Sequence, residues 1–507
     1  MPKYFYILFV LIFTISCTEI ENKEEKGEPT RYQEKYRPQY HFTPPSGWMN
    51  DPNGMVYYAG EYHLFYQHNP DSTVWGPMHW GHAVSEDLVN WEHLPIAIYP
   101  DSLGTIFSGS AVLDQKNTSG LGTENNPPLV AIYTYHNAEM EKAGSDKFQT
   151  QGIAYSIDSG RNWQKYEGNP VLKNPGIKDF RDPKVSWHSE SQKWIMSLAV
   201  KDKISFYSSP DLLNWTFESD FGQALGAHGG VWECPDLFPL DFAGEEKWIL
   251  LVSINPGGPN GGSATQYFIG DFDGKEFTTE QEETLWVDYG TDNYAGVTWS
   301  NVNDKQLFLG WMSNWQYANI VPTDNWRSAM TIARELSLSE IDGKLRLLNS
   351  PVENYKNLLQ KKSHNWELIG QDSFLLQQAS EWTEFSFKNN RSDNQLIRFD
   401  FFNDEGEELL FNLDFAENIV SIDRSLIDNH SFSEKFKSVQ KAPMNVSSDK
   451  LKIEIYKDAS SVEIFINEGE LVMSALYFSE KDLNRIRVTS NHSMTADIQA
   501  ADFHSIW

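Results

Sequence analysis

The sequence predicts an all-β protein, with a propeller-like domain followed by a β-sandwich. Short apolar or alternating runs, each the length of one β-strand, recur between clusters of Gly, Pro, Asn and Asp. A turn motif built on Ser, Asp and Trp recurs in the first half of the chain, whereas the C-terminal part has strand patterns without it. Long helical periodicity is absent. The 507 residues are too many for one ordinary core, so two domains are expected.

Residues 1–17 predict a lipoprotein signal peptide. Lys3 precedes an apolar run from Tyr4 to Ile15, which is too short to span a bilayer comfortably. The run ends at Thr14-Ile15-Ser16-Cys17, which resembles a bacterial lipoprotein cleavage site with Cys17 as the lipid-bearing residue. Thr14 stands where Leu is usual in such sites. A plain secretory signal and a single anchoring helix are the alternatives.

Residues 18–37 predict a disordered tether, since Thr18 to Thr30 is rich in Glu and Lys and has no core-forming pattern. Membrane contact is then expected only through the N-terminal lipid anchor. The expected location is the cell envelope, at the surface or the periplasmic face of the outer membrane, or otherwise secretion. Apart from Cys17 the chain has one cysteine, Cys234, so no intrachain disulfide is expected.

Residues 38–350 predict the propeller-like domain. Its clearest strand-like runs are 60–67, 128–133 and 247–252. The recurring turn motif stands at Ser85–Trp91, Ser209–Trp215 and, with one more residue, Ser156–Trp163. Each copy follows one strand-like run and precedes another. A hairpin turn in which Ser and Asp bond the backbone and Trp packs beneath fits repeated blades.

Residues 351–362 predict a linker helix, because Val352 to Lys362 is the best helix candidate of the chain. Residues 363–507 predict the β-sandwich. Polar and apolar residues alternate there in short runs, as expected for half-buried strands. The clearest runs are Leu396–Phe401, Leu451–Ile455 and Ser461–Ile466.

The charge of the chain narrows the choice of partner. The 71 acidic and 41 basic residues give a formal net charge of −30, which argues against nucleic acid and against an anionic membrane surface. A neutral substrate is the natural alternative. Aromatic residues make up 14% of the chain and include 18 Trp, which suits both a β-rich core and an aromatic-lined pocket.

Three acids stand at or just before X-Pro units, far apart in the sequence. They are Asp51 in Gly47–Gly54, Asp182 in Phe180–Pro183, and Glu233 in Trp232–Pro235. Proline biases the residue before it towards extended or turn conformations, so these side chains are free to point into a cavity. Each acid alone is most simply a turn or surface carboxylate. Together they suggest a fold that gathers separate strands around one pocket.

Three convergent carboxylates suit the hydrolysis of an acetal bond. Asp51, if hydrogen-bonded by neighbouring amides, would stay ionised and act as nucleophile. Glu233 reaches further, and nearby Asp charges would raise its pKa and suit it as general acid and then base. Asp182 would hold sugar hydroxyls and stabilise positive charge in the transition state. Arg181 would orient hydroxyls or keep an acid ionised, or simply pair with Asp182.

The chain resembles glycoside hydrolase family 32, the invertase, inulinase and levanase group, over residues 38–507. Trp48–Gly54, Arg181–Pro183 and Glu233–Pro235 match the family's nucleophile, transition-state-stabiliser and acid/base motifs. The resemblance implies a five-bladed β-propeller followed by a C-terminal β-sandwich. It also implies a retaining reaction that needs no metal and no cofactor. His79 and His82, three residues apart, are accordingly expected to be structural.

The same resemblance implies a fructose-binding subsite. Its expected residues are Asn50, Pro52, Asn53, Gln67, Trp75, Phe107, Ser108, Arg181 and Trp315. The amides, the hydroxyl and the guanidinium among them can bond the hydroxyls of a sugar, and the indoles offer flat apolar faces. Core packing is the simpler role for any one Trp.

We therefore expect a β-fructofuranosidase that releases terminal fructose from levan, inulin or both, and from sucrose, through a covalent fructosyl-Asp51 intermediate. An endo-acting levanase is the nearest alternative. A non-catalytic fructan-binding lipoprotein is the alternative from another class, against which the three intact acids speak. The turn motif at Ser156–Trp163 also resembles the Asp-box of sialidases. The protein is expected to be a monomer or a homodimer.

Overall fold

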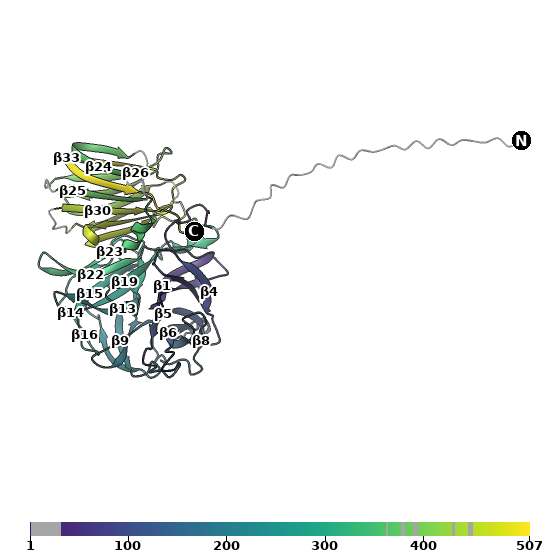
Figure 1. Ribbon diagram of the computed structural model, residues 1–507. Helices are drawn as coiled ribbons and strands as arrows, with labels where there is room; N and C mark the ends of the chain where they lie inside the picture. The colour runs from purple at the N-terminus through teal and green to yellow at the C-terminus, as the bar shows by residue number, and fades with distance from the viewer. Residues whose placement is uncertain (2–31, 361–363, 377–380, 389–393, 428–430, 445–449) are drawn as a thin grey trace.

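The computed structural model describes residues 1, 32–360, 364–376, 381–388, 394–427, 431–444 and 450–507. The predicted signal peptide, the lipid site Cys17 and the tether up to residue 31 lie outside the described residues. The chain forms a five-bladed β-propeller, with a second β-domain stacked on one side of it (Figure 1). The all-β fold, with a propeller before a C-terminal sheet domain, is confirmed.

Each blade is an antiparallel sheet whose strands follow one another in the sequence. Blade 1 contains β1 (Gly47–Tyr58), β2 (Glu61–Asn69), β3 (His79–Ser85) and β4 (Glu92–Ile98). Blade 2 contains β5 (Thr105–Leu113), β6 (Leu129–His136), β7 (Gln149–Ser156) and β8 (Gln164–Lys165). Blade 3 contains β9 (Phe180–His188), β10 (Lys193–Val200), β11 (Lys203–Ser209) and β12 (Thr216–Phe221).

The last two blades carry additional short strands. Blade 4 contains β13 (Val231–Phe242), β14 (Glu245–Asn255), β15 (Ala264–Phe272), β16 (Phe277–Thr278) and β17 (Leu285–Trp286). Blade 5 contains β18 (Tyr294–Thr298), β19 (Gln306–Met312), β21 (Ala329–Met330), β22 (Arg334–Ile341) and β23 (Lys344–Pro351). Strand β20 (Trp326–Arg327) pairs in parallel with β1 and so helps to join the end of the propeller to its beginning.

The first strand of each blade lies innermost, so that β1, β5, β9, β13 and β18 surround the propeller axis as successive neighbours. The ring closes where the Ser300 amide donates to Met55 O at 3.0 Å and the Tyr57 amide donates to Ser300 O at 2.9 Å. Any side chain that leaves an inner strand towards the axis therefore meets side chains from the other blades.

The recurring turn motif joins the third strand of a blade to its outermost strand in blades 1, 2 and 3. In the first copy the Asp87 amide donates to Ser85 Oγ at 3.1 Å, and Asp87 Oδ1 accepts from the Asn90 amide at 2.7 Å. The other two copies repeat these bonds around Asp158 and Asp211. The predicted hairpin turn is confirmed.

The helical segments among the described residues are short. They are α1 (Ala138–Lys142) and the 3-10 turns η1 (Ala318–Ile320), η2 (Glu353–Leu358) and η3 (Asn467–Gly469). The segment predicted as a linker helix thus holds the 3-10 turn η2, and its residues 361 and 362 lie outside the described residues. In the part of the chain that the structure describes, no helix has the length and apolar character needed to cross a bilayer.

The last part of the predicted tether packs against the folded body. Tyr36 and Arg37 are 7% and 1% exposed. The Arg37 guanidinium donates to Thr43 Oγ1 at 3.0 Å and to Pro44 O at 2.8 Å, and it lies over the ring of Trp326. This differs from the expected disorder. The composition of a segment does not show that residues far along the chain, such as Trp326, provide a surface that buries its side chains.

Ten strands of the second domain lie within the described residues. They are β24 (His364–Leu376), β25 (Trp382–Lys388), β26 (Leu396–Phe402), β27 (Glu408–Asp414), β28 (Ile419–Leu426), β29 (Val439–Pro443), β30 (Lys450–Lys457), β31 (Ser461–Ile466), β32 (Leu471–Leu476) and β33 (Arg485–Ala501). The long β33 pairs with β26 through its first half and with β25 through its second half. The sheet thereby folds over into two layers around one apolar core, in which Phe385 and Phe399 meet edge to face at 4.8 Å. This is the arrangement of a β-sandwich.

Buried charges join the two domains. Arg334 of β22 donates to Glu463 Oε2 of the sandwich at 2.6 Å and to Asp288 Oδ2 at 2.9 Å. On the other side of Glu463, the ring of His41 lies 2.9 Å from Oε1 and 2.7 Å from Asp458 Oδ2. All these side chains are at most 2% exposed. Removing one partner would leave a buried charge unpaired, so the domains are held in a fixed relation.

His41 should make the protein less stable as the pH rises into the alkaline range. Burial acts to lower its pKa, but the hydrogen bonds and charges of Asp458 and Glu463 outweigh this and raise it from 6.5 to about 9. The folded state therefore favours the protonated ring. The corresponding stabilisation, ~3 kcal/mol, is complete below pH 6.5 and is lost as the pH rises through about 9.

We expect the melting temperature to fall between pH 6.5 and pH 10, and His41→Gln to melt lower than the wild type at pH 6 with a difference that shrinks towards pH 10. The exposed His504→Gln serves as control. A constant difference across this pH range would show that protonation of His41 is not the cause.

Candidate active site

All five inner strands leave regular pairing at the same end of the propeller. Register shifts interrupt them between Asn50 and Pro52, Ile106 and Gly109, Arg181 and Lys184, Glu233 and Asp236, and Tyr294 and Val297. A β-bulge re-aims the side chains beside it and bends its strand. Three of the bulges hold a proline, which has no N–H to give to a ladder. The X-Pro units at Pro52, Pro183 and Pro235 therefore lie where three of the inner strands turn side chains towards the axis.

The bulges surround one cavity of about 320 Å³. It is lined by Asn50, Asp51, Gln67, Trp75, Phe107, Ser108, His136, Glu141, Phe148, Gln149, Asp179, Arg181, Asp182, Glu233, Asn255 and Trp315. The three predicted acids thus meet in one pocket, together with most of the predicted binding residues. Pro52 and Asn53 do not line it. Asn53 is 1% exposed and donates to the Asp51 carbonyl at 3.0 Å, so it supports the bulge from behind.

Asp51 is held by two neutral donors. Its Oδ1 accepts from the side-chain amide of Asn50 at 2.9 Å, and its Oδ2 accepts from Ser108 Oγ at 2.7 Å. Burial raises the pKa of Asp51, the charge of Glu233 raises it further, and the bonds from Ser108 and Asn50 oppose these effects. Both carboxylate oxygens of Asp51 therefore have a fixed direction in the pocket.

Asp182 sits on a left-handed backbone, with φ of 61°. Its own amide donates to Thr134 Oγ1 at 3.0 Å, and its Oδ2 accepts from the Cys234 amide at 3.2 Å. The Cys234 thiol lies 3.7 Å from Asp51 Oδ2 and 3.8 Å from Asp182 Oδ2. Cys234 is 4% exposed and stands between the two carboxylates. Burial raises the pKa of its thiol, which does not suit a nucleophile.

Glu233 is clamped between two neighbouring blades. Its Oε1 accepts from Arg181 Nε at 3.1 Å and from Nη2 at 3.0 Å, and its Oε2 accepts from the Tyr294 hydroxyl. The Arg181 Nη1 donates to Asp179 at 2.8 Å. Burial acts to lower the pKa of Arg181, but the charges of Glu233, Asp182 and Asp179 raise it above its ordinary value. One guanidinium thus pairs with several carboxylates. Arg181 pairs more closely with Glu233 than with Asp182, whose Oδ2 lies 3.9 Å from Arg181 Nε.

Aromatic side chains form the rest of the wall. Trp75 is 43% exposed and meets Phe107 edge to face at 6.0 Å. Trp315 lies against the buried Trp48, with ring centroids 5.8 Å apart, and the Trp48 indole N–H donates to Asn50 Oδ1 at 2.7 Å. The aromatic wall therefore also orients the amide that holds Asp51.

Several residues of the site were not predicted from the sequence. His136, Glu141, Phe148, Gln149, Asp179 and Asn255 line the pocket, and Tyr294 bonds Glu233. Asp179 and Asn255 carry a weak signal, because one precedes Arg181 by two residues and the other begins an Asn-Pro unit. The others are ordinary strand and loop residues in the sequence. Among the described residues, no group of three or more His, Cys, Asp and Glu is arranged to hold a metal ion.

A pocket on a propeller axis that brings the three predicted acids together with one guanidinium and aromatic faces has the groups that hydrolysis of a glycosidic bond needs, which is the chemistry of the glycoside hydrolases. The chain matches two family descriptions, "Glycosyl hydrolases family 32 N-terminal domain" over residues 41–351 and "Glycosyl hydrolases family 32 C terminal" over residues 346–505. The chain belongs to glycoside hydrolase family 32.

Individual relatives agree with this assignment. A levanase of Bacillus subtilis is 47% identical over 502 residues, which covers 94% of this chain and 70% of the relative. An extracellular exo-inulinase of Aspergillus awamori is 39% identical over 92% of this chain and 94% of the relative. The crystal structure of an exo-inulinase from Aspergillus awamori superposes with a TM-score of 0.86 and 37% identity, over 94% of this chain and all of that one.

A third relative was solved with a ligand. The β-fructofuranosidase of Schwanniomyces occidentalis, complexed with fructosyl-erythritol, gives a TM-score of 0.82 at 32% identity. The similarity covers 93% of this chain and 99% of that one. The family and the fold expected from the sequence motifs are both confirmed, and the protein is a glycoside hydrolase.

Asp182→Asn should stabilise the protein at neutral pH. Burial raises the pKa of Asp182; Arg181 opposes this, Glu233 and Asp51 add to it, and the result is about 7 against an ordinary value of 3.8. The folded state therefore binds this proton more tightly than the unfolded state, and the carboxylate destabilises the fold increasingly as the pH rises from 3.8 through about 7.

An amide avoids this penalty, so we expect a gain of the order of 2–4 kcal/mol at pH 8 and almost none at pH 4. Thermal unfolding of both forms at the two pH values measures it. A variant that melts no higher than the wild type at pH 8 would show that Asp182 is not strained in the folded protein.

Proposed function

We propose that this protein is a retaining exo-β-fructosidase that releases terminal fructose from levan, inulin or both, and from sucrose. The observation that carries the proposal is the convergence of Asp51, Asp182 and Glu233 in one pocket of about 320 Å³. Relatives named levanase and exo-inulinase support the substrate class.

In the first step, Asp51 attacks C2 of the terminal fructosyl residue. The bond from C2 to the leaving oxygen breaks, that oxygen takes a proton from Glu233, and a fructosyl-Asp51 ester forms. The bonds from Asn50 and Ser108 fix the carboxylate of Asp51 for this attack. Cys234 and Asp182 lie beside it, and Asp182 faces the positive charge that develops on the ring.

In the second step, Glu233 takes a proton from water while the water oxygen attacks C2 and releases Asp51. The configuration at C2 is retained because the carbon is inverted twice. Glu233 must serve both the leaving oxygen and the incoming water from one position. Its clamp between Arg181 and Tyr294 supports this role, since it leaves the carboxylate little freedom to rotate.

The size of the pocket favours exo action. A volume of about 320 Å³ is near the lower end for ligand sites and suits one sugar ring with part of the next. Trp75, which lines the pocket and is 43% exposed, offers an apolar face for a sugar ring. An endo-acting levanase would need room for fructosyl residues on both sides of the scissile bond.

We also propose that the protein acts outside the cytoplasm, as a lipoprotein attached through Cys17 or as a secreted enzyme. The pattern of residues 1–17 supports this, and so does the name "extracellular" of the Aspergillus awamori relative.

Asp51→Asn should abolish hydrolysis, because an amide cannot form the ester, whereas Glu233→Gln should lower kcat on inulin by roughly 10²–10⁴-fold. Reducing sugar released from inulin and sucrose measures both. Asp71→Asn and Glu245→Gln, at exposed positions, are the matched controls. Full activity of Asp51→Asn would remove the nucleophile from the proposal.

Product analysis on levan and inulin side by side tests the function itself. We expect fructose as the only early product, from either or both polymers. Early oligosaccharides would indicate endo action, and the relative rates would give the linkage preference. If the wild type releases nothing from inulin, levan or sucrose, the proposal fails.

A further inference from the structure

A ring of hydrogen bonds ties the five inner strands together just beyond the bulges. Ser300 Oγ donates to Ala111 O at 2.7 Å and lies 3.3 Å from Met55 O, which joins blade 5 to blades 2 and 1. Ser110 Oγ donates to Pro183 O at 3.0 Å and accepts from the Val185 amide at 3.0 Å, which joins blade 2 to blade 3. We call these bonds, with the link described next, the axial ring.

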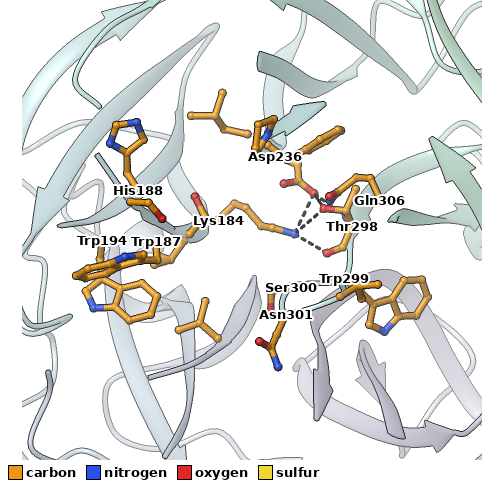
Figure 2. Close-up of a pocket in the computed structure, with 18 of the residues that line it drawn as sticks. Lys184, Trp187, His188, Trp194, Asp236, Thr298, Trp299, Ser300, Asn301 and Gln306 are labelled. Atoms are coloured by element: carbon orange, nitrogen blue, oxygen red, sulfur yellow. Dashed lines mark hydrogen bonds and ion pairs between the residues drawn. The ribbon is translucent and has the colours of Figure 1, made fainter. Parts of the chain in front are cut away.

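The link between blades 3, 4 and 5 is an ion pair. Figure 2 shows Lys184 reaching across to Asp236 and Thr298. Its Nζ donates to Asp236 Oδ2 at 2.9 Å and to Thr298 O at 2.6 Å. Asp236 Oδ2 also accepts from the Thr298 amide at 2.6 Å and from its hydroxyl at 2.8 Å. Lys184 is 8% exposed and Asp236 is not exposed at all.

The three strands joined by this pair are the strands that clamp Glu233. Arg181 belongs to β9 with Lys184, Glu233 belongs to β13 with Asp236, and Tyr294 belongs to β18 with Thr298. Two sets of contacts therefore cross the same three strands, one at the acids and one a few residues further along. The distance between Arg181 and Tyr294, and thus the space for Glu233, depends on how the second set spaces the strands.

Lys184 and Asp236 lie where a contact between strands has the greatest effect on the spacing of β9, β13 and β18. Each is the first residue after its bulge to pair regularly with the next strand, Lys184 with Ser197 and Asp236 with Leu251. The bulges themselves lack regular pairing and cannot set the spacing. An anchor at the end of each bulge fixes the point from which the irregular residues extend.

Apolar packing does not replace this anchor. Beyond the pair, on the side away from the acids, lies a cavity of about 570 Å³ lined by Trp187, Trp194, Trp248 and Trp299. The strands are thus not filled in by side chains across the axis there (Figure 2). The ammonium of Lys184 has three donors on one atom, so it can hold Asp236 of β13 and Thr298 of β18 at once.

We propose that Lys184 and Asp236 are positioning residues for the acid/base Glu233. They space β9, β13 and β18 so that the Glu233 carboxylate stays aligned with the leaving oxygen. This inference rests on the proposed function. The alternative is a purely structural pair, whose loss would lower stability but leave the chemistry of the folded enzyme unchanged.

The test compares two substrates that differ in their need for an acid. Sucrose requires protonation of its leaving oxygen. A nitrophenyl β-fructofuranoside releases nitrophenolate, a stable anion, and its leaving oxygen needs no proton. In Lys184→Met we expect kcat/KM on sucrose to fall between about 10- and 100-fold, as for a displaced catalytic group. We expect kcat/KM on the nitrophenyl substrate to fall less than about 3-fold, because kcat/KM reports formation of the fructosyl-Asp51 ester and not its hydrolysis, in which Glu233 acts on water with either substrate.

Asp236→Asn, which keeps the shape of the side chain, is the second variant and should show the same selective loss in weaker form. Lys457→Met is the matched control, because Lys457 is a buried lysine of the sandwich paired with Asp482 at 2.7 Å. It should lower the melting temperature and leave the ratio of the two rates as in the wild type.

The outcomes separate the two levels of the proposal. If the wild type hydrolyses neither substrate, the proposed function fails. If the wild type hydrolyses both and the folded variants lose both rates equally, or lose neither, Lys184 and Asp236 do not position Glu233. Circular dichroism and thermal unfolding of each variant establish that the folded form is being assayed.

Discussion

The structure depends on one constraint: all five inner strands lose regular pairing at the same end of the propeller, and the blades must nevertheless stay joined. The bulges that result turn Asp51, Asp182 and Glu233 towards the axis. In blades 1 to 4 the second and third strands pair without a register shift, and the axial ring holds the inner strands where pairing resumes. The irregular geometry of the pocket is thus carried by regular structure on every side.

The pocket concentrates more negative charge than its single guanidinium can balance. Arg181 lies within 4 Å of Asp179, Asp182 and Glu233, while Asp51 relies on neutral donors. Burial then raises the pKa of Asp182 to about 7. Such a group destabilises the fold at neutral pH, and it persists because a buried charge interacts strongly with the charge that forms during reaction.

The sequence predicts the parts of the site that have a local cause. Asp51, Asp182 and Glu233 are marked by prolines that force a bulge, and the Ser-Asp-Trp turns are marked by side chains that bond their own backbone. Pro52 and Asn53 were expected at the pocket because they belong to the same motif, but within a bulge neighbouring side chains point to different sides, and Asn53 is buried behind Asp51. Tyr294 and Lys184 have no local signal, since their partners come from other blades.

The interface between propeller and sandwich has a consequence for how such a chain can change. Apolar residues of both domains, including the buried Trp48, which packs against the pocket residue Trp315, and Phe465 of the sandwich, belong to one continuous core. Arg334 and His41 each need a carboxylate that the sandwich provides. The sandwich is therefore no interchangeable module. If the propeller were recombined with the C-terminal domain of another protein, Arg334 and His41 would be buried at an interface without the carboxylates that pair with them.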